Sequence, residues 1–135
     1  MTTESTLLIV KPDGVRRGLV GEVLRRVEAK GLTIEQLRME TITRETAEEH
    51  YGEHAEKPFF GELVDFITGG PVVLATVSGE SAISVCRTLI GPTDPIGAPP
   101  GTIRGDLATI ITENIVHGSD SPESAARELK LFFPD

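Results

Sequence analysis

The sequence is poor in several residue types, and each shortage excludes a class of protein. Its 135 residues include one cysteine, Cys86, so an intrachain disulfide and a cysteine cage for a metal are both excluded. No run of about eighteen apolar residues occurs, so the sequence offers no candidate membrane span. Lys and Arg number 13 against 21 Asp and Glu, for a net charge of −8. This excess of acid argues against a basic face for nucleic acid or a membrane surface.

Familiar nucleotide-binding and hydrolase motifs are missing as well. The sequence contains neither G-x-x-x-x-G-K-[ST] nor G-x-G-x-x-G, so it has no Walker phosphate loop and no Rossmann fingerprint. It also lacks the G-x-S-x-G motif of serine hydrolases. Any phosphate group would therefore have to be held by side chains.

The length and the first residues indicate the number of domains and the location. A chain of 135 residues is long enough for one domain with its own core, so we expect a single domain over residues 1–135. Residues 1–5 carry no positive charge, and the apolar run at 7–10 is too short for a signal peptide. We therefore expect a cytoplasmic protein.

Hydrophobic periodicity predicts four strands separated by helices. The strands are expected at residues 6–11, 32–42, 72–77 and 115–116. Helices are expected at residues 18–31, 43–50, 63–67, 81–91 and 121–132, and a turn at 12–14. This order predicts an α+β ferredoxin-like βαββαβ sandwich, a four-stranded antiparallel sheet covered by helices. A doubly wound parallel sheet is the competing architecture, but the strands are too few for it.

The segment NIVHGSDS, residues 114–121, is the centre of the functional prediction. His117 follows a short apolar strand, and Gly118 lets the backbone turn sharply after it. Ser121 can cap the helix that begins next, and Pro122 suits its first position. The imidazole of His117 is therefore expected at a strand edge beside a helix N-terminus.

Glu128 falls on or beside the apolar stripe of that helix. An inward carboxylate needs a partner, and the nearest candidate by chain geometry is His117. A carboxylate that accepts one ring N–H fixes the tautomer and leaves the other nitrogen free as a nucleophile or base. The alternative is that Glu128 only borders the stripe and reaches water.

Cations fall at or near the ends of predicted elements, where side chains converge on a cleft. Each of Lys11, Arg87 and Arg104 alone is typical of a surface cation. Together with His117 and a stiff loop at residues 91–101, which holds four prolines, they predict an anion site with one nucleophile.

A second pair of histidines suggests a different chemistry. His50 and His54 stand four residues apart among acids, which is a spacing that could bind zinc. Gly52 between them would break the helix needed to align them. We therefore expect a solvated, charged face here.

Three motifs carry a close resemblance to the nucleoside diphosphate kinase family. They are VKPDGV at 10–15, GTIRGD at 101–106 and NIVHGSDS at 114–121, and the resemblance extends to Glu128. It implies a ping-pong enzyme in which Nδ1 of His117 accepts the γ-phosphoryl group of a nucleoside triphosphate, typically ATP, and passes it to a nucleoside diphosphate. Glu128 would hold Nε2–H of that ring, with Ser119 in the same hydrogen-bond set.

The same resemblance assigns the remaining site residues. Arg87, Arg104, Lys11 and a Mg²⁺ that bridges the phosphates would neutralise charge, with no metal ligand from protein side chains. Thr93 would contact a phosphate oxygen, and Tyr51 would lie near the transferred group. Lys11 and Asn114 would hold the ribose hydroxyls. Phe59 would stack on the base, which explains acceptance of all common bases.

The resemblance also implies a homo-oligomer, with a hexamer expected first and a tetramer second. Asp94 stands where an Asn is common and Glu113 where an Arg is common. Two other functions remain open on the same scaffold. One is a nucleotide-binding or phosphohistidine-relay module without full turnover, and the other is a sensor of small ligands.

Overall fold

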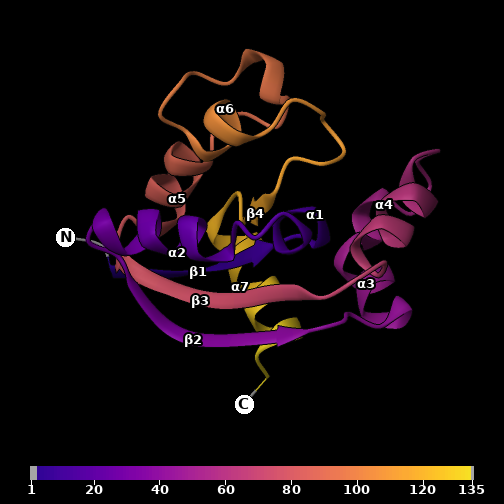
Figure 1. Cartoon of the computed structure of the whole chain (residues 1–135). Coiled ribbons are helices and arrows are strands. Elements are labelled where there is room, and N and C mark those ends of the chain that lie inside the picture. The colour runs from indigo at the N-terminus through magenta and orange to yellow at the C-terminus, as the bar shows by residue number, and fades with distance from the viewer. Residues whose placement is uncertain (1–2, 135) are drawn as a thin grey trace.

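A computed structural model describes residues 3–134, which form one antiparallel sheet with helices on both faces (Figure 1). The strands are β1 (Thr3–Val10), β2 (Thr33–Glu40), β3 (Val72–Glu80) and β4 (Val116–Gly118). Their order across the sheet is β2-β3-β1-β4, and each neighbouring pair is antiparallel. This topology confirms the predicted ferredoxin-like α+β sandwich.

Helices connect the strands in the order that the sequence predicts, with additions. The helices are α1 (Pro12–Arg16), α2 (Val20–Ala29), α3 (Arg44–His50), α4 (Phe60–Ile67), α5 (Ala82–Ile90), α6 (Ile103–Leu107) and α7 (Pro122–Phe132). Two 3-10 turns, η1 (Gly52–His54) and η2 (Pro95–Gly97), complete the chain.

The central strand β1 builds a core on each face of the sheet. Because side chains alternate along a strand, Leu8 and Val10 face one side, and Leu7 and Ile9 face the other. The first side packs against α2 and α5, where Cys86 is buried among the apolar residues. The second side packs against α3, α4 and α7. Burial raises the pKa of the Cys86 thiol to about 11, so Cys86 is a packing residue.

Pairing between β1 and β4 brings distant segments to one end of the sheet. Val10 lies opposite Val116, and Ile9 lies opposite His117. Lys11 follows the last residue of β1 and therefore emerges beside β4. The tip of one strand and the imidazole on its neighbour are in this way fixed by backbone hydrogen bonds.

Three local predictions are wrong. Residues 12–14 were expected as a turn, but they begin α1, because Pro12 suits the first helical position and its missing N–H is not needed there. The helix α6 was not expected within the loop after α5; the side chain of Thr102 accepts from the N–H of Gly105 and caps it. Strand β4 starts at Val116, so His117 lies in its middle and Ile115 lies outside it.

Among residues 3–134, none of the helices combines the length and the apolar character that crossing a bilayer would require.

Candidate active site

A cleft of about 210 Å³ opens at the end of the sheet where β1 and β4 meet. Its walls come from α3, η1, α5, α7 and the loop before β4. The lining includes eight of the predicted site residues: Lys11, Tyr51, Arg87, Thr93, Arg104, Asn114, His117 and Glu128. The structure thus brings together side chains that lie up to 117 residues apart in the sequence.

His117, Glu128 and Ser119 form a hydrogen-bonded set on one side of this cleft. Nε2 of His117 lies 3.1 Å from Oε1 of Glu128, and the hydroxyl of Ser119 donates to the same oxygen at 2.6 Å. A carboxylate oxygen can only accept, so Nε2 carries the hydrogen in this contact. When the His117 ring is neutral, Nδ1 is therefore its unprotonated nitrogen.

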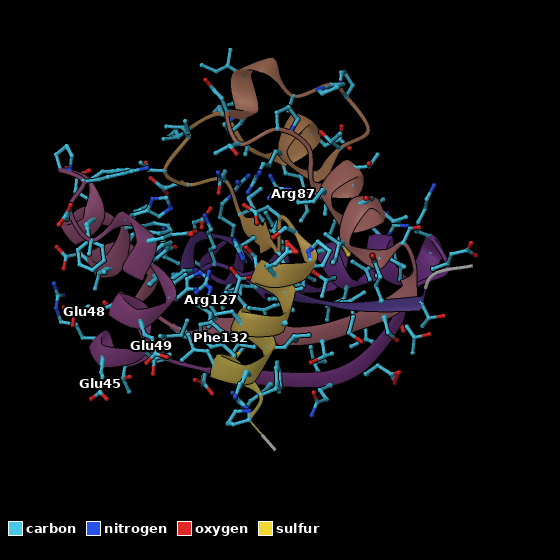
Figure 2. The ribbon with its side chains drawn as sticks, turned by 180° about the vertical axis from the view of Figure 1, so that it is seen from behind. Glu45, Glu48, Glu49, Arg87, Arg127 and Phe132 are labelled. Atoms are coloured by element: carbon cyan, nitrogen blue, oxygen red, sulfur yellow. The ribbon has the colours of Figure 1, made fainter. Side chains whose placement is uncertain are left out.

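Glu128 is buried because its helix is fixed at both ends. Ser121 caps α7 by accepting from the N–H of Ser124, and Phe132 anchors the far end in the core. Figure 2 looks onto α7, with Phe132 and Arg127 along the helix and Arg87 beyond its N-terminal end. The side chain of Glu128 is only 5% exposed, so the alternative that it reaches water is wrong.

Glu128 stays ionised although it is buried, because hydrogen-bond donors surround its carboxylate. Burial alone would raise the pKa of this carboxyl, but the hydrogen bonds from His117 and Ser119 and the charge of His117 lower that pKa to about 2. The carboxylate is therefore ionised at neutral pH. It can stabilise positive charge that develops on the His117 ring.

Lys11 and Asn114 hold each other at the cleft. Nζ of Lys11 donates to Oδ1 of Asn114 at 2.9 Å, and Nδ2 of Asn114 donates to the carbonyl of Thr93 at 3.0 Å. Burial and the charge of Arg104 lower the pKa of Lys11 to about 8. The ammonium is thus still mostly protonated at neutral pH, and it is held by a neutral partner rather than by an acid.

Arg104 is buried and mainly organises the backbone. Its guanidinium donates to the carbonyls of Asn114 at 3.2 Å, Gly91 at 3.1 Å and Val116 at 2.6 Å. Five N–H groups are available, so one remains on each terminal nitrogen. Burial and the neighbouring Arg87 lower the pKa of Arg104 to about 10, and Arg87 itself donates to the carbonyl of Gly118 at 3.1 Å.

His50 does not lie on a solvated face, so that prediction is wrong. Figure 2 shows Glu45, Glu48 and Glu49 on the outer side of α3, and this part of the helix is charged as expected. His50 points the other way and is 5% exposed. Its ring packs nearly perpendicular to that of His117, with centroids 5.1 Å apart. The signal in the sequence was the spacing of three from the buried Ala47, which places both residues on one helical face.

The structure groups His50 with residues other than His54, and this grouping does not support a zinc site. His54 is not part of a metal-type cluster; instead His50, His117 and Glu128 place possible ligand atoms within 4.8 Å, the only such group in the described part of the chain. Oε1 of Glu128 already accepts two hydrogen bonds. The cluster is therefore better explained as a carboxylate that orients one imidazole, with a second imidazole packed against it.

Two aromatic residues occupy different positions. Tyr51 lines the cleft, and burial together with the charge of Glu128 raises the pKa of its hydroxyl to about 12. Phe59 lies outside the cleft lining, is partly exposed and packs edge-on to His54 with ring centroids 5.7 Å apart. Since His54 lines the cleft, Phe59 lies close to its rim.

Comparisons with known proteins agree on one family. A family model described as nucleoside diphosphate kinase matches residues 4–135. A nucleoside diphosphate kinase of Rubrobacter xylanophilus is 65% identical over 130 residues, which are 96% of this chain and 98% of the relative. One from Frankia casuarinae is 62% identical over 134 residues, with 99% and 98% covered.

Solved structures give the same result. A halophilic nucleoside diphosphate kinase from Halobacterium salinarum in complex with CDP aligns with a TM-score of 0.96 at 46% identity, covering 99% of this chain and 90% of that chain. A nucleoside diphosphate kinase family protein from Babesia bovis aligns with a TM-score of 0.94 at 48% identity, covering 96% of this chain and 88% of that chain.

The buried imidazole of His50 makes stability depend on pH. Burial and the charge of His117 lower the pKa of His50 to about 3, whereas the unfolded chain takes up this proton near 6.5. The stabilisation is therefore complete above about pH 6.5 and is lost as the pH falls towards 3. We expect the free energy of unfolding in urea to fall by roughly 1–3 kcal/mol between pH 6.5 and 4.5, and His50→Gln to remove most of this slope. An equal slope in both proteins would contradict the assignment.

Proposed function

Because this chain belongs to the nucleoside diphosphate kinase family, whose members move a phosphoryl group between nucleotides, we propose that His117 carries that group here. The observation that supports this role is the contact between Nε2 of His117 and the buried Glu128 at 3.1 Å. In the neutral ring this contact leaves Nδ1 as the nitrogen without a proton, on a side chain that lines the cleft and is 24% exposed. The enzyme itself transfers a phosphoryl group from a nucleoside triphosphate to a nucleoside diphosphate.

The reaction proceeds in two displacements at one nitrogen. The lone pair of Nδ1 attacks the γ-phosphorus, the bond to the β–γ bridging oxygen breaks, and the nucleoside diphosphate leaves with the bonding electrons. The ring becomes a phosphoimidazole with Nε2–H still donated to Glu128. A terminal oxygen of a second diphosphate then attacks the same phosphorus and releases the ring unchanged. Glu128 stabilises the positive ring in both transition states, and Ser119 keeps that carboxylate in place.

Charge on the transferred group is neutralised by the cations of the cleft. Arg87 and the free N–H groups of Arg104 reach the phosphates, and Lys11 adds an ammonium at the end of β1. Phosphoryl transfer needs mainly positioning and such neutralisation, because the protein has little covalent chemistry to perform. Tyr51 lies near the transferred group, and Thr93 contacts a phosphate oxygen.

Enzymes of this family generally depend on a divalent metal, and we propose Mg²⁺ bound to the nucleotide phosphates. The cleft fits an ion that would arrive with its nucleotide, because the cations of its lining outnumber the carboxylates by four to three and the oxygen of Glu128 nearest His117 is already occupied by hydrogen bonds. When bound, the ion would supply further neutralisation of the phosphates. The protein side chains hold the nucleotide itself.

The nucleoside portion of the substrate extends away from His117. Lys11 and Asn114 hold the ribose hydroxyls, and Phe59 at the rim stacks on the base. A stacked ring recognises the π-face of a base, so this contact tolerates all common bases. The relative from Halobacterium salinarum was solved with CDP, which is a nucleoside diphosphate with a pyrimidine base.

We propose that the enzyme works as a homo-oligomer in the cytoplasm, with a hexamer before a tetramer. Apolar side chains exposed in a single chain support this, since Leu37 and Met39 line the edge strand β2 and Ile96 is 83% exposed on the proline loop. Sedimentation should give a mass six times that of the 14.5-kDa chain, or four times for a tetramer. A monomer would contradict the proposal.

Labelling tests the role of His117. Incubation with γ-labelled ATP and Mg²⁺ should give a label on wild type that is stable to base and lost in acid, and His117→Ala should not be labelled. Adding a second nucleoside diphosphate should discharge the label into a new triphosphate. His54→Ala is the control for labelling of a second histidine at the cleft, and this variant should still become labelled. Labelling of His117→Ala would refute the mechanism, and a label that no diphosphate accepts would favour a relay module.

Removal of the negative charge at Glu128 should slow phosphorylation without unfolding the protein. We expect Glu128→Gln to lower the rate of label incorporation by roughly tenfold to a hundredfold, because the ring loses the charge that stabilises its positive form. Glu123→Gln, on the exposed first turn of the same helix, is the matched control and should react at the wild-type rate. A Glu128→Gln rate equal to that of the control would return Glu128 to a purely structural role.

A further inference from the structure

Ile115, between two site residues, has a backbone conformation that its side chain disfavours. Its φ is +74°, and within residues 3–134 only Ser81 shares a positive φ without being glycine. The N–H of Val116 donates to the carbonyl of Asn114 at 2.8 Å, which closes a γ-turn centred on Ile115. A β-branched residue is a strong outlier in this region, so the turn is strained and must be held by its surroundings.

The segment that follows β1 holds both polar groups of Ile115. Its N–H donates to Oδ2 of Asp13 at 3.0 Å, and its carbonyl accepts from the N–H of Lys11 at 2.7 Å. Asp13 is completely buried, although it is a carboxylate. Gly14 permits this close approach, because a Cβ there would lie 3.0 Å from the Ile115 carbonyl.

The strained turn at Ile115 sets the distance between Asn114 with Lys11 on one side of the site and His117 on the other. Asn114 precedes it and holds Lys11, whereas His117 lies two residues after it in β4. Arg104 binds the carbonyls on either side of Ile115, so the flanking residues are fixed but the strained residue depends on the segment at 11–13. A relaxed Ile115 would shift the Asn114 amide relative to the imidazole.

We propose that Asp13 is a positioning residue for phosphoryl transfer: its carboxylate holds Ile115 in the strained turn that places Asn114 and Lys11 relative to His117. This inference rests on the proposed roles of those three residues. It assigns to Asp13 a task that neither a helix cap nor a surface acid would perform, since the side chain is buried and its hydrogen bond leaves its own helix.

A second effect of Asp13 has to be separated from this one. The carboxylate lies close enough to Lys11 and Arg104 for its charge to raise the pKa of both groups, in opposition to their burial. Asp13→Asn removes this charge but keeps a carbonyl oxygen for the Ile115 N–H, whereas Asp13→Ala removes both. Comparison of the two variants therefore isolates the hydrogen bond.

The decisive experiment measures His117 phosphorylation by ATP in variants of Asp13 and Ile115, with rates expressed per folded enzyme. In the Ile115 background we expect Asp13→Ala to slow the reaction by roughly tenfold to a hundredfold, and Asp13→Asn to stay within about threefold of wild type. In an Ile115→Gly background the effect of Asp13→Ala should shrink to about twofold, because glycine adopts a positive φ without support.

Controls cover loss of stability and failure to fold. Val27→Ala weakens the core cluster that contains Ile115 from a position on α2 outside the turn, and it should keep the wild-type rate. Asp13→Ser replaces Asp13→Ala if the alanine variant does not fold. The serine side chain is one bond shorter than that of aspartate, so its oxygen ends about 1.2 Å, the length of a C=O bond, before the position of Oδ2. Ile115→Asn replaces Ile115→Gly on the same grounds, since asparagine tolerates positive φ.

Three results would overturn the inference. They are an unchanged rate in Asp13→Ala, an equal loss in Asp13→Asn and Asp13→Ala, and an equal loss in both Ile115 backgrounds. Each is read against wild-type enzyme that does become labelled. Absence of label from the wild type would instead refute the proposed role of His117, so the two failures are distinguishable.

Discussion

A carboxylate with almost no access to water dominates the organisation of this protein. Glu128 is tolerated in the interior because His117 and Ser119 donate to the same oxygen, and because α7 is capped at Ser121 and anchored at Phe132. The same contacts fix the tautomer of His117 and select Nδ1 as the free nitrogen. Stability and reactivity thus depend on one arrangement of hydrogen bonds.

The opposite wall of the cleft is built from backbone rather than from free side chains. Arg104 donates three of its N–H groups to carbonyls around β4 and in the loop after α5. Lys11 and Asp13 hydrogen-bond to the carbonyl and the N–H of Ile115. Cations that the sequence suggests as phosphate ligands therefore also fix the backbone around the site. This explains why Arg104 lines the cleft although it is almost fully buried. Asp13 is fully buried outside that lining, where it accepts from the N–H of Ile115.

The sequence predicted the topology because β1 and β3 are continuous apolar runs and α2, α5 and α7 have clear helical periodicity. It predicted the His117–Glu128 contact because eleven residues of strand end, turn and capped helix bring the two together. It did not give α6, which is only five residues long and is held by Thr102. For the inward orientation of His50 the sequence offered only the spacing from Ala47, because the packing against Phe132 and His117 appears only in the fold. The strain at Ile115 was also hidden, since it arises only when residues 11–13 dock beside it.

The acidic outer face of α3 affects how substrates arrive. Glu45, Glu48 and Glu49 lie on the outside of the wall that borders the cleft, on a protein with a net charge of −8, while Lys11, Arg87 and Arg104 line its interior. The net charge therefore repels an arriving polyanionic nucleotide, whereas these three cations attract it. Dissolved salt screens both effects, so the rate at which a nucleotide reaches the cleft should depend on ionic strength.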